Sequence, residues 1–86
     1  MIRFHVDWLP DAIDDLAEIW MRAANRASVN FASAMIDQRL AESPSEWGKE
    51  VREELYEFNA PPLRVLFTID DANHVVEIFR AFLSSS

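Results

Sequence analysis

Residues 61–82 constrain the fold more than any other part of the chain, because they have the sequence pattern of a β-hairpin. Valine, isoleucine, leucine and phenylalanine dominate both halves of this segment, which opens with two prolines. Residues 70–73, with the sequence DDAN, supply turn-forming side chains between the halves. The segment is therefore predicted to form two neighbouring antiparallel strands.

Each predicted strand of this hairpin carries one arginine. If Ile69 pairs with Val75, then Arg64 and Arg80 lie directly opposite each other on one face of the sheet. Like charges in that position repel, so either acidic neighbours neutralise the two arginines or the pair forms a site for an anion. An ion-paired sheet surface and a functional anion site both remain open from the sequence.

The length and composition predict one domain, residues 1–83, followed by a flexible serine tail at residues 84–86. Half of the 86 residues are apolar, yet no run approaches the ~18 consecutive apolar residues of a membrane span, so no membrane partner is expected. The chain has no cysteine, which excludes disulfides and thiolate metal sites and is consistent with a cytoplasmic protein.

The net charge limits the possible partners. A formal charge of -7 repels phosphate at long range, whereas a general nucleic-acid-binding protein needs a basic surface. A role on nucleic acid would require a local cluster of the eight lysines and arginines. The alternative is a partner that is itself basic.

The first half of the chain reads as a strand followed by two helices. Residues 2–8 alternate apolar and polar side chains, and His5 and Asp7 are interpreted as a solvated strand face rather than a metal site. A helix starts at Pro10, with acidic residues in its opening turns. Its predicted sheet-facing stripe consists of Ile13, Leu16, Ala17, Trp20, Ala23 and Ala24, with Ile19 beside it.

A second helix is predicted from a cap at Ser28 to about Glu42, forming a helical hairpin with the first. Its inward stripe consists of Val29, Ala32, Met35, Ile36 and Leu40. Phe31 lies off this stripe, either at the edge of the core or in a partner interface. The only glycine, Gly48, is predicted to adopt a positive φ in the connection that follows.

Residues 50–58 are predicted to form one more strand, rich in acids that could pair with Arg64 or Arg80, namely Glu53, Glu54 and Glu57. The predicted order is β-α-α-β-β-β. It describes an α+β domain in which a helical hairpin packs on one face of a mostly antiparallel four-stranded sheet. The opposite face carries the two arginines and is the candidate functional surface.

Three stretches of this sequence share patterns with one known family. The first helix carries P-x-A-x-x-D-L-x-x-I, residues 40–44 with Gly48 follow, and the last two strands contain Leu63-Arg64-Val65-Leu66-Phe67 and then Val75, Val76, Ile78 and Arg80. In these positions and in element order the chain resembles the RelE/ParE toxin superfamily, a plasmid stabilisation protein family. The resemblance implies the toxin component of a type II toxin-antitoxin module, masked by a cognate antitoxin.

For a RelE-like member, the resemblance implies a metal-independent mRNA interferase that cuts mRNA on the ribosome. Arg64 and Arg80 match the family's strand arginines, and Lys49 and Arg52 stand near its second-strand basic residues. Tyr56 is the candidate for proton transfer from a neighbouring strand. The sequence departs from related nucleases two and three residues after Arg80, where phenylalanine and leucine replace the histidine or tyrosine often found there.

For a ParE-like member, the resemblance instead implies growth inhibition by binding DNA gyrase. A third alternative is a catalytically degenerate protein that acts only through protein-protein interaction. In both cases the partner surface is predicted around Phe31, Phe79, Phe82 and Leu83. None of these alternatives implies a cofactor or a metal.

Overall fold

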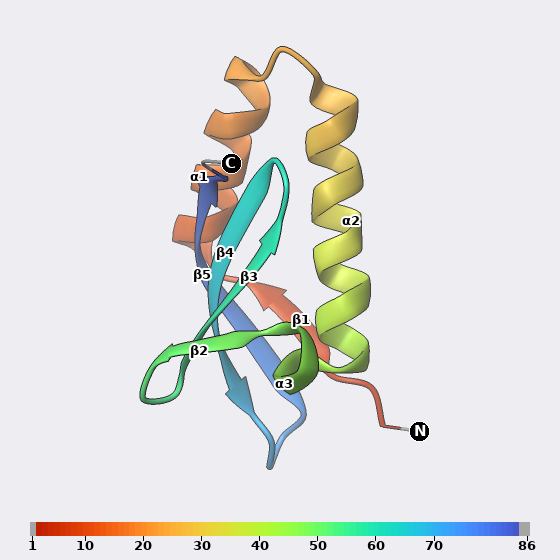
Figure 1. The fold of residues 1–86 in the computed structure, drawn as a ribbon, viewed down its shortest axis with the longest axis vertical. Helices are drawn as coiled ribbons and strands as arrows, with labels where there is room; N and C mark the ends of the chain where they lie inside the picture. The colour runs from red at the N-terminus through yellow and green to blue at the C-terminus, as the bar shows by residue number, and fades with distance from the viewer. Residues whose placement is uncertain (1, 85–86) are drawn as a thin grey trace.

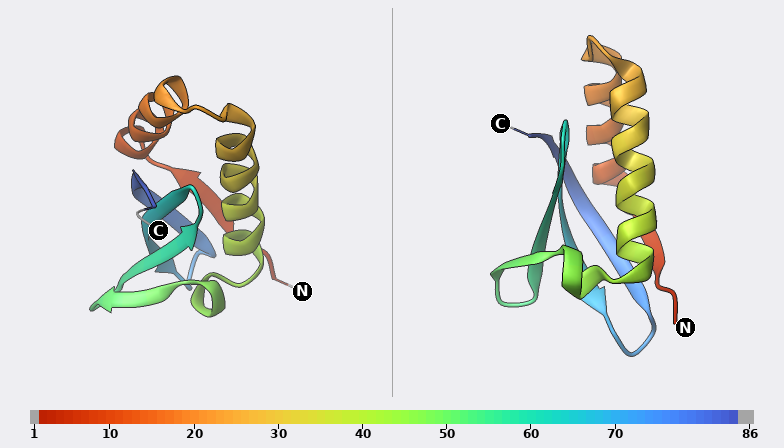
Figure 2. Two further views of the ribbon diagram at one scale, coloured as in Figure 1. Left: turned by 45° about the horizontal axis from the view of Figure 1, so that its top comes forward. Right: turned by 45° about the vertical axis from the view of Figure 1, so that its right-hand side comes forward.

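Five strands form one mixed sheet, and two long helices cover one of its faces (Figures 1 and 2). The structure is a computed structural model and describes residues 2–84. In chain order its elements are β1 (His5–Trp8), α1 (Pro10–Arg22), α2 (Arg26–Glu42), α3 (Pro44–Trp47), β2 (Lys49–Arg52), β3 (Leu55–Ala60), β4 (Leu63–Asp70) and β5 (Val75–Leu83).

The sheet has the strand order β1-β5-β4-β3-β2. Only the β1–β5 pair is parallel, and the other three pairs are antiparallel. The α+β class and the mostly antiparallel sheet with its helical hairpin are thus confirmed. The side of the sheet away from the helices is called the outer face below.

The predicted strand count was wrong, because residues 49–60 form two strands instead of one. The chain reverses between β2 and β3, where Glu54 adopts a positive φ of 63°. The carboxylate of Glu50 accepts a hydrogen bond from the Glu54 backbone N–H at 3.1 Å and stabilises this turn. A tight turn made of glutamates lacks the glycine and asparagine that usually mark a turn, so the sequence pattern did not indicate that β2 ends there.

The core lies between the sheet and the helices. Its largest fully buried side chains are Phe67, Ile36, Leu40, Leu63, Ile78, Val29, Val65 and Val76. The inward stripe predicted for α2 is confirmed for its members that appear in this core or against it, namely Val29, Ala32, Met35, Ile36 and Leu40. The start predicted for α2 was wrong, because Asn25 is the N-cap and its side chain accepts the Ser28 backbone N–H at 3.1 Å.

The sheet-facing side of α1 differs from the predicted stripe. Its residues in or against the core are Ala12, Leu16, Ile19 and Ala23. Ile13 and Trp20 are instead 52% and 39% exposed and turn toward α2. The apolar side of α1 is wider than the sheet requires, so part of it is left uncovered between the two helices.

Residue 48 is a glycine because there is no room for a side chain. The positive φ predicted for Gly48 was wrong. Its φ is -82°, which any residue can adopt. A Cβ added there would lie 2.4 Å from Cζ of Phe67 and 2.8 Å from the Pro44 carbonyl oxygen. The backbone therefore passes so close to the core phenylalanine that only glycine fits without a shift.

The β4–β5 hairpin forms as predicted, with a different register. Asp70 closes the turn by accepting the Asn73 backbone N–H at 3.1 Å and the Asn73 side-chain amide at 2.9 Å. Asp70 pairs with Val75 and Ile69 with Val76, one residue away from the predicted alignment. At the other end of the hairpin, the backbone N–H of Ser84 donates to the Pro62 carbonyl at 2.8 Å.

The remainder of the predicted tail, residues 85–86, lies outside the described residues. Within residues 2–84, no helix combines the length and apolar character needed to cross a membrane.

Candidate functional site

A β-bulge determines where the two hairpin arginines lie. Near the turn, Phe67 pairs with Ile78, whereas Leu66 pairs with Arg80, so Phe79 is an extra residue on β5. Without it, the one-residue change of register would place Arg64 and Arg80 on opposite faces. The bulge restores the alternation, and both arginines point to the outer face. They are not directly opposite, as predicted, because Arg64 pairs with Phe82.

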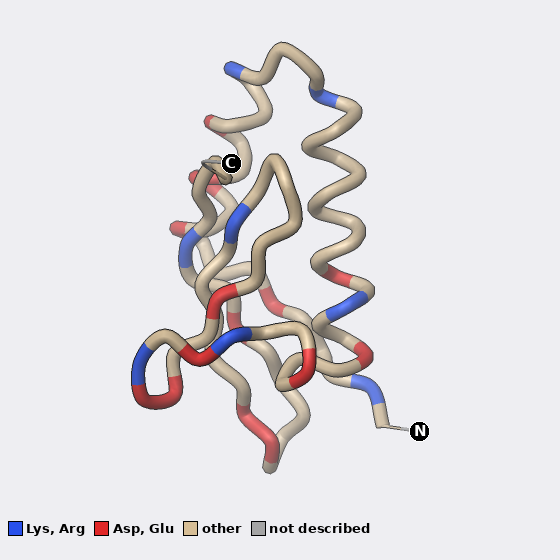
Figure 3. The backbone as a smooth tube through the Cα atoms, in the orientation of Figure 1, with Lys and Arg blue, Asp and Glu red and all other residues tan. Residues whose placement is uncertain are grey.

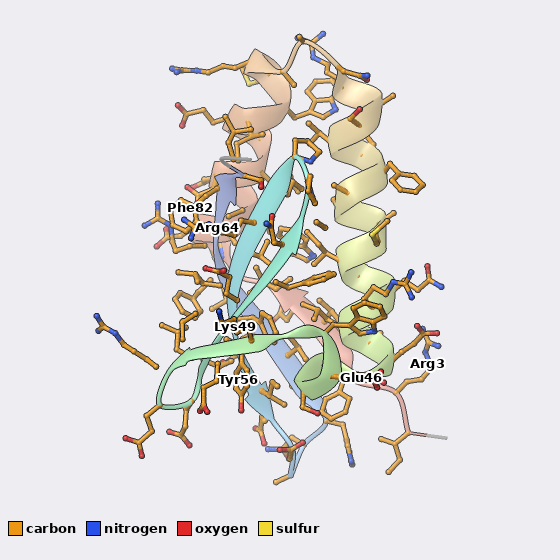
Figure 4. The ribbon with its side chains drawn as sticks, viewed as in Figure 1. Arg3, Glu46, Lys49, Tyr56, Arg64 and Phe82 are labelled. Atoms are coloured by element: carbon orange, nitrogen blue, oxygen red, sulfur yellow. The ribbon has the colours of Figure 1, made fainter. Side chains whose placement is uncertain are left out.

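The two arginines share one aromatic ring. The guanidinium carbon of Arg64 lies 5.1 Å from the centroid of the Phe82 ring, and that of Arg80 lies 5.6 Å from it. Figure 4 shows Arg64 and Phe82 side by side on adjacent strands. Guanidinium groups are attracted to aromatic faces at such distances. Phe82 thus brings together the two cations that the sequence placed on separate strands.

Arg80 is held by a carboxylate from α1. Its Nε and Nη2 atoms donate to the two oxygens of Asp15 at 2.7 and 3.2 Å. Asp15 also accepts the backbone N–H of Ala81 at 3.0 Å, so one side chain ties α1 to β5. The hydrogen bond from Arg80 is the largest cause that lowers the pKa of Asp15 below its ordinary 3.8.

Arg64 has a weaker partner on the neighbouring strand. Its Nη1 atom lies 3.0 Å from Oε2 of Glu57, a diagonal neighbour on β3. Glu57 in turn pairs with Lys49 of β2 in the strand register, so both point to the outer face. The prediction that an acid of this region pairs with a hairpin arginine is confirmed for Glu57. Its carboxylate stands between two basic residues.

The other two predicted site residues lie apart from the arginines. Tyr56 points to the helix side of the sheet, where its ring stacks on Phe67 with centroids 5.7 Å apart. Arg52 ends β2 and precedes the Glu53–Glu54 turn. In Figure 4, Lys49 and Tyr56 lie near β2, away from Arg64 and Phe82. The structure therefore groups Arg64, Arg80 and Phe82, with Lys49 further along the same face.

The aromatic partner of both arginines is Phe82. Within residues 2–84, neither arginine contacts a tyrosine or a histidine. In the same part of the chain, no three histidine, aspartate or glutamate side chains gather in the way a metal ion requires. The arrangement places two guanidinium groups beside one ring, each of them paired with a carboxylate that an external anion would have to replace. It lacks the imidazole or phenol that would transfer a proton there.

Asp15 is the site residue whose role sequence reasoning missed. In the sequence it is one of the acidic residues in the opening turns of the first helix. Its position three residues after Ala12 and four before Ile19 places it at the border of the true sheet-facing stripe. A correct assignment of that stripe was the signal that could have found it.

An apolar groove lies between α1 and α2. It has a volume of about 500 Å³ and is lined by Ile13, Leu16, Ala17, Trp20, Met21, Val29, Asn30 and Ser33. Met21 is 67% exposed at its edge. Exposed apolar surface of this kind usually marks a binding site.

The partner surface predicted around four apolar residues does not form one patch. Phe31 lies on α2 in a shallow hollow with Ala34, Met35, Gln38 and Arg39. Phe82 and Leu83 instead line a hollow with Asp15, Glu18, Ile19 and Arg22. These hollows share no residue, so the predicted patch is divided between two places.

The fold relates this chain to known proteins although its sequence does not. No protein-family profile and no curated protein matches it. A chain of the toxin-antitoxin complex RelBE2 from Mycobacterium tuberculosis superposes with a TM-score of 0.83 at 20% identity, over 100% of this chain and 97% of that one. The chain has the RelE/ParE toxin fold.

Two further solved structures have the same fold. The archaeal RelE-RelB complex from Pyrococcus horikoshii OT3 gives a TM-score of 0.70 at 13% identity, over 98% of both chains. The chromosomal ParDE TA system from P. aeruginosa gives 0.71 at 11% identity, over 96% of this chain and 98% of that one. The chains from the two Rel complexes give TM-scores of 0.83 and 0.70, and the ParDE chain gives 0.71, so the fold alone does not separate RelE-like from ParE-like activity.

Proposed function

We propose that this chain is the toxin component of a type II toxin-antitoxin module and inhibits growth by binding a target. Its likeness to chains from toxin-antitoxin complexes over nearly their whole length supports the toxin role. The outer face around Arg64, Arg80 and Phe82 is the proposed target surface. It combines an aromatic ring with two cations, the residue types that contribute most to protein interfaces.

One observation favours binding over cleavage. The ring between the two arginines belongs to Phe82, which cannot move a proton, while Tyr56 stacks on Phe67 on the other side of the sheet. Figure 3 shows acidic positions beside basic ones along β2, and Glu57 shares the outer face with Lys49 and Arg64, so that face is not uniformly basic. A face of mixed charge suits a protein target such as DNA gyrase, as in a ParE-like action, better than it suits ribosomal RNA.

Ribosome-dependent mRNA cleavage is the second candidate. Lys49, Arg64 and Arg80 share the outer face, and arginine and lysine side chains stabilise the charge that develops when a phosphodiester is attacked. On this alternative the reaction would proceed by positioning and charge stabilisation, with Arg64 and Arg80 as the catalytic residues.

The proposed antitoxin binds the groove between α1 and α2 through an amphipathic helix. The groove offers Ile13, Trp20 and Met21 as exposed apolar contacts. Asp14 is exposed on α1 between the groove residues Ile13 and Leu16, which favours a helix with basic flanks. A chain of charge -7 gains the most from such a partner.

The deciding experiment is induced expression in a bacterial host, with growth and mRNA 5′ ends followed together. We expect growth arrest without new cuts inside translated codons, and loss of arrest in Arg64→Ala. Arg52→Ala is the matched control, because it removes an exposed arginine from β2 away from Phe82. Arrest with codon cuts that disappear in Arg64→Ala would establish the cleavage alternative, and no arrest would contradict the toxin role.

A further inference from the structure

The two arginines that share the Phe82 ring are paired with carboxylates in very different ways. Asp15 receives three hydrogen bonds, two from Arg80 and one from the backbone of Ala81. Glu57 receives one hydrogen bond from Arg64 in the contacts of residues 2–84. Two pairs that look equivalent by charge therefore differ in how firmly they are held.

Asp15 fixes Arg80 in place. Both of its oxygens are engaged by the guanidinium group in the bidentate manner that makes such pairs strong. The same carboxylate also binds the β5 backbone, so an external anion would have to replace a contact to the main chain as well. Arg80 is thereby positioned beside the ring, and its charge is already compensated.

Glu57 is held at one oxygen only, and it lies between two cations. Arg64 contacts it from β4, and Lys49 is its register partner on β2. A guanidinium group has five N–H donors, and a single bond to one carboxylate oxygen uses one of them. The Glu57 carboxylate thus occupies the place on Arg64 that an incoming oxyanion would take, with Lys49 on the neighbouring strand.

We propose that Glu57 is an internal competitor for an oxyanion, of the phosphate type, that binds Arg64, while Asp15 is a positioning residue that keeps Arg80 unavailable. An arriving anion displaces the Glu57 carboxylate from Arg64, and Lys49, the register partner of Glu57 on β2, adds a positive charge on the same face. Arg64 is then the arginine that receives the ligand, and Glu57 determines how tightly the anion binds. This inference rests on the proposed outer-face target surface for its biological meaning, and a phosphate ligand there corresponds to the cleavage alternative rather than to a protein target.

The first test needs no variant. The arginine side-chain Nε–H signals of the ¹⁵N-labelled chain are followed by NMR during titration with inorganic phosphate, and in a second titration with a short single-stranded RNA. We expect the Arg64 signal to move and the Arg80 signal to stay. Movement with RNA as well as phosphate assigns the ligand to nucleic-acid phosphate, and movement with phosphate alone assigns it to a free oxyanion. Movement of Arg80 alone, or of neither signal, would overturn the proposal.

The second test compares two variants that remove the same charge. Glu57→Gln should raise the affinity for inorganic phosphate by about three- to fivefold, the range of an exposed ion pair. Glu53→Gln, in the β2–β3 turn, should change it by less than about twofold, because screening weakens distant charges. Equal gains in the two variants would show a general charge effect and overturn the proposal. Neither titration requires toxicity, so a chain that fails to arrest growth could still pass both.

Discussion

The outer face of the sheet and the groove between α1 and α2 differ in what a ligand must do to bind there. On the outer face, Arg64 and Arg80 already have partners within the chain, Glu57 and Asp15. In the groove, Ile13 and Met21 are 52% and 67% exposed. A ligand of the outer face must displace internal contacts, whereas a ligand of the groove gains free energy simply by burying apolar surface. Tight, lasting binding is thus expected at the groove and selective binding at the outer face.

A substitution that destabilises the core should impair ligand binding at both surfaces. Gly48→Ala places a methyl group 2.4 Å from the ring of Phe67 and should lower the free energy of unfolding by about 2 kcal/mol, within the usual range of overpacking. Denaturant unfolding measures this loss, with Ser45→Ala on α3 as an exposed control. An unchanged midpoint would contradict the steric role given to Gly48.

Changes in the groove should affect the antitoxin alone. Met21→Glu puts a charge at the edge of the apolar groove and should weaken antitoxin binding by about 2 kcal/mol, roughly thirtyfold, without loss of stability. The matched control is Phe31→Glu, because Phe31 and Met21 are both 67% exposed but lie on different sides of the helical hairpin. Calorimetric titration of the two variants measures the difference. Equal losses of antitoxin affinity in the two variants would contradict the assignment of the groove as the antitoxin site.

The sequence predicted the elements whose signals are local. The apolar runs of β4 and β5, the Asp70 turn and the inward stripe of α2 were all found from residue types and spacing. The resemblance to the RelE/ParE superfamily correctly anticipated the fold. Such features depend on residues a few positions apart, which is where sequence patterns carry information.

Some of the errors came from contacts between distant residues. The ring of Phe67 determines that residue 48 must be glycine. Arg80 is paired with Asp15, which lies 65 positions earlier in the chain. The Phe79 bulge alters the register midway along a hairpin whose turn gives no sign of it. The two arginines were singled out as candidates because charged residues in an apolar strand stand out, while their unequal partners depend on three-dimensional packing.

The smallest effect concerns the two ion pairs of the outer face and depends on pH. Asp15→Asn should lower Tm by about 5 °C near neutral pH, since the bidentate pair with Arg80 is lost. Glu57→Gln should lower it less, because only one hydrogen bond is removed. Asp14→Asn is the control, as it removes the same charge from the neighbouring position of α1.

The pH dependence identifies the cause of that difference. The pKa of Asp15 is lowered in the folded chain, chiefly by the hydrogen bond from Arg80, so the unfolded chain binds the proton more readily. The stability from this pair is therefore complete above the ordinary pKa of 3.8 and is lost as the pH falls below it, through the folded value. The Tm gap between the wild-type chain and Asp15→Asn should close over that interval in thermal scans. A gap that stays constant into strong acid would mean that Asp15 acts through packing, and the contrast drawn between the two arginine pairs would then lose its electrostatic basis.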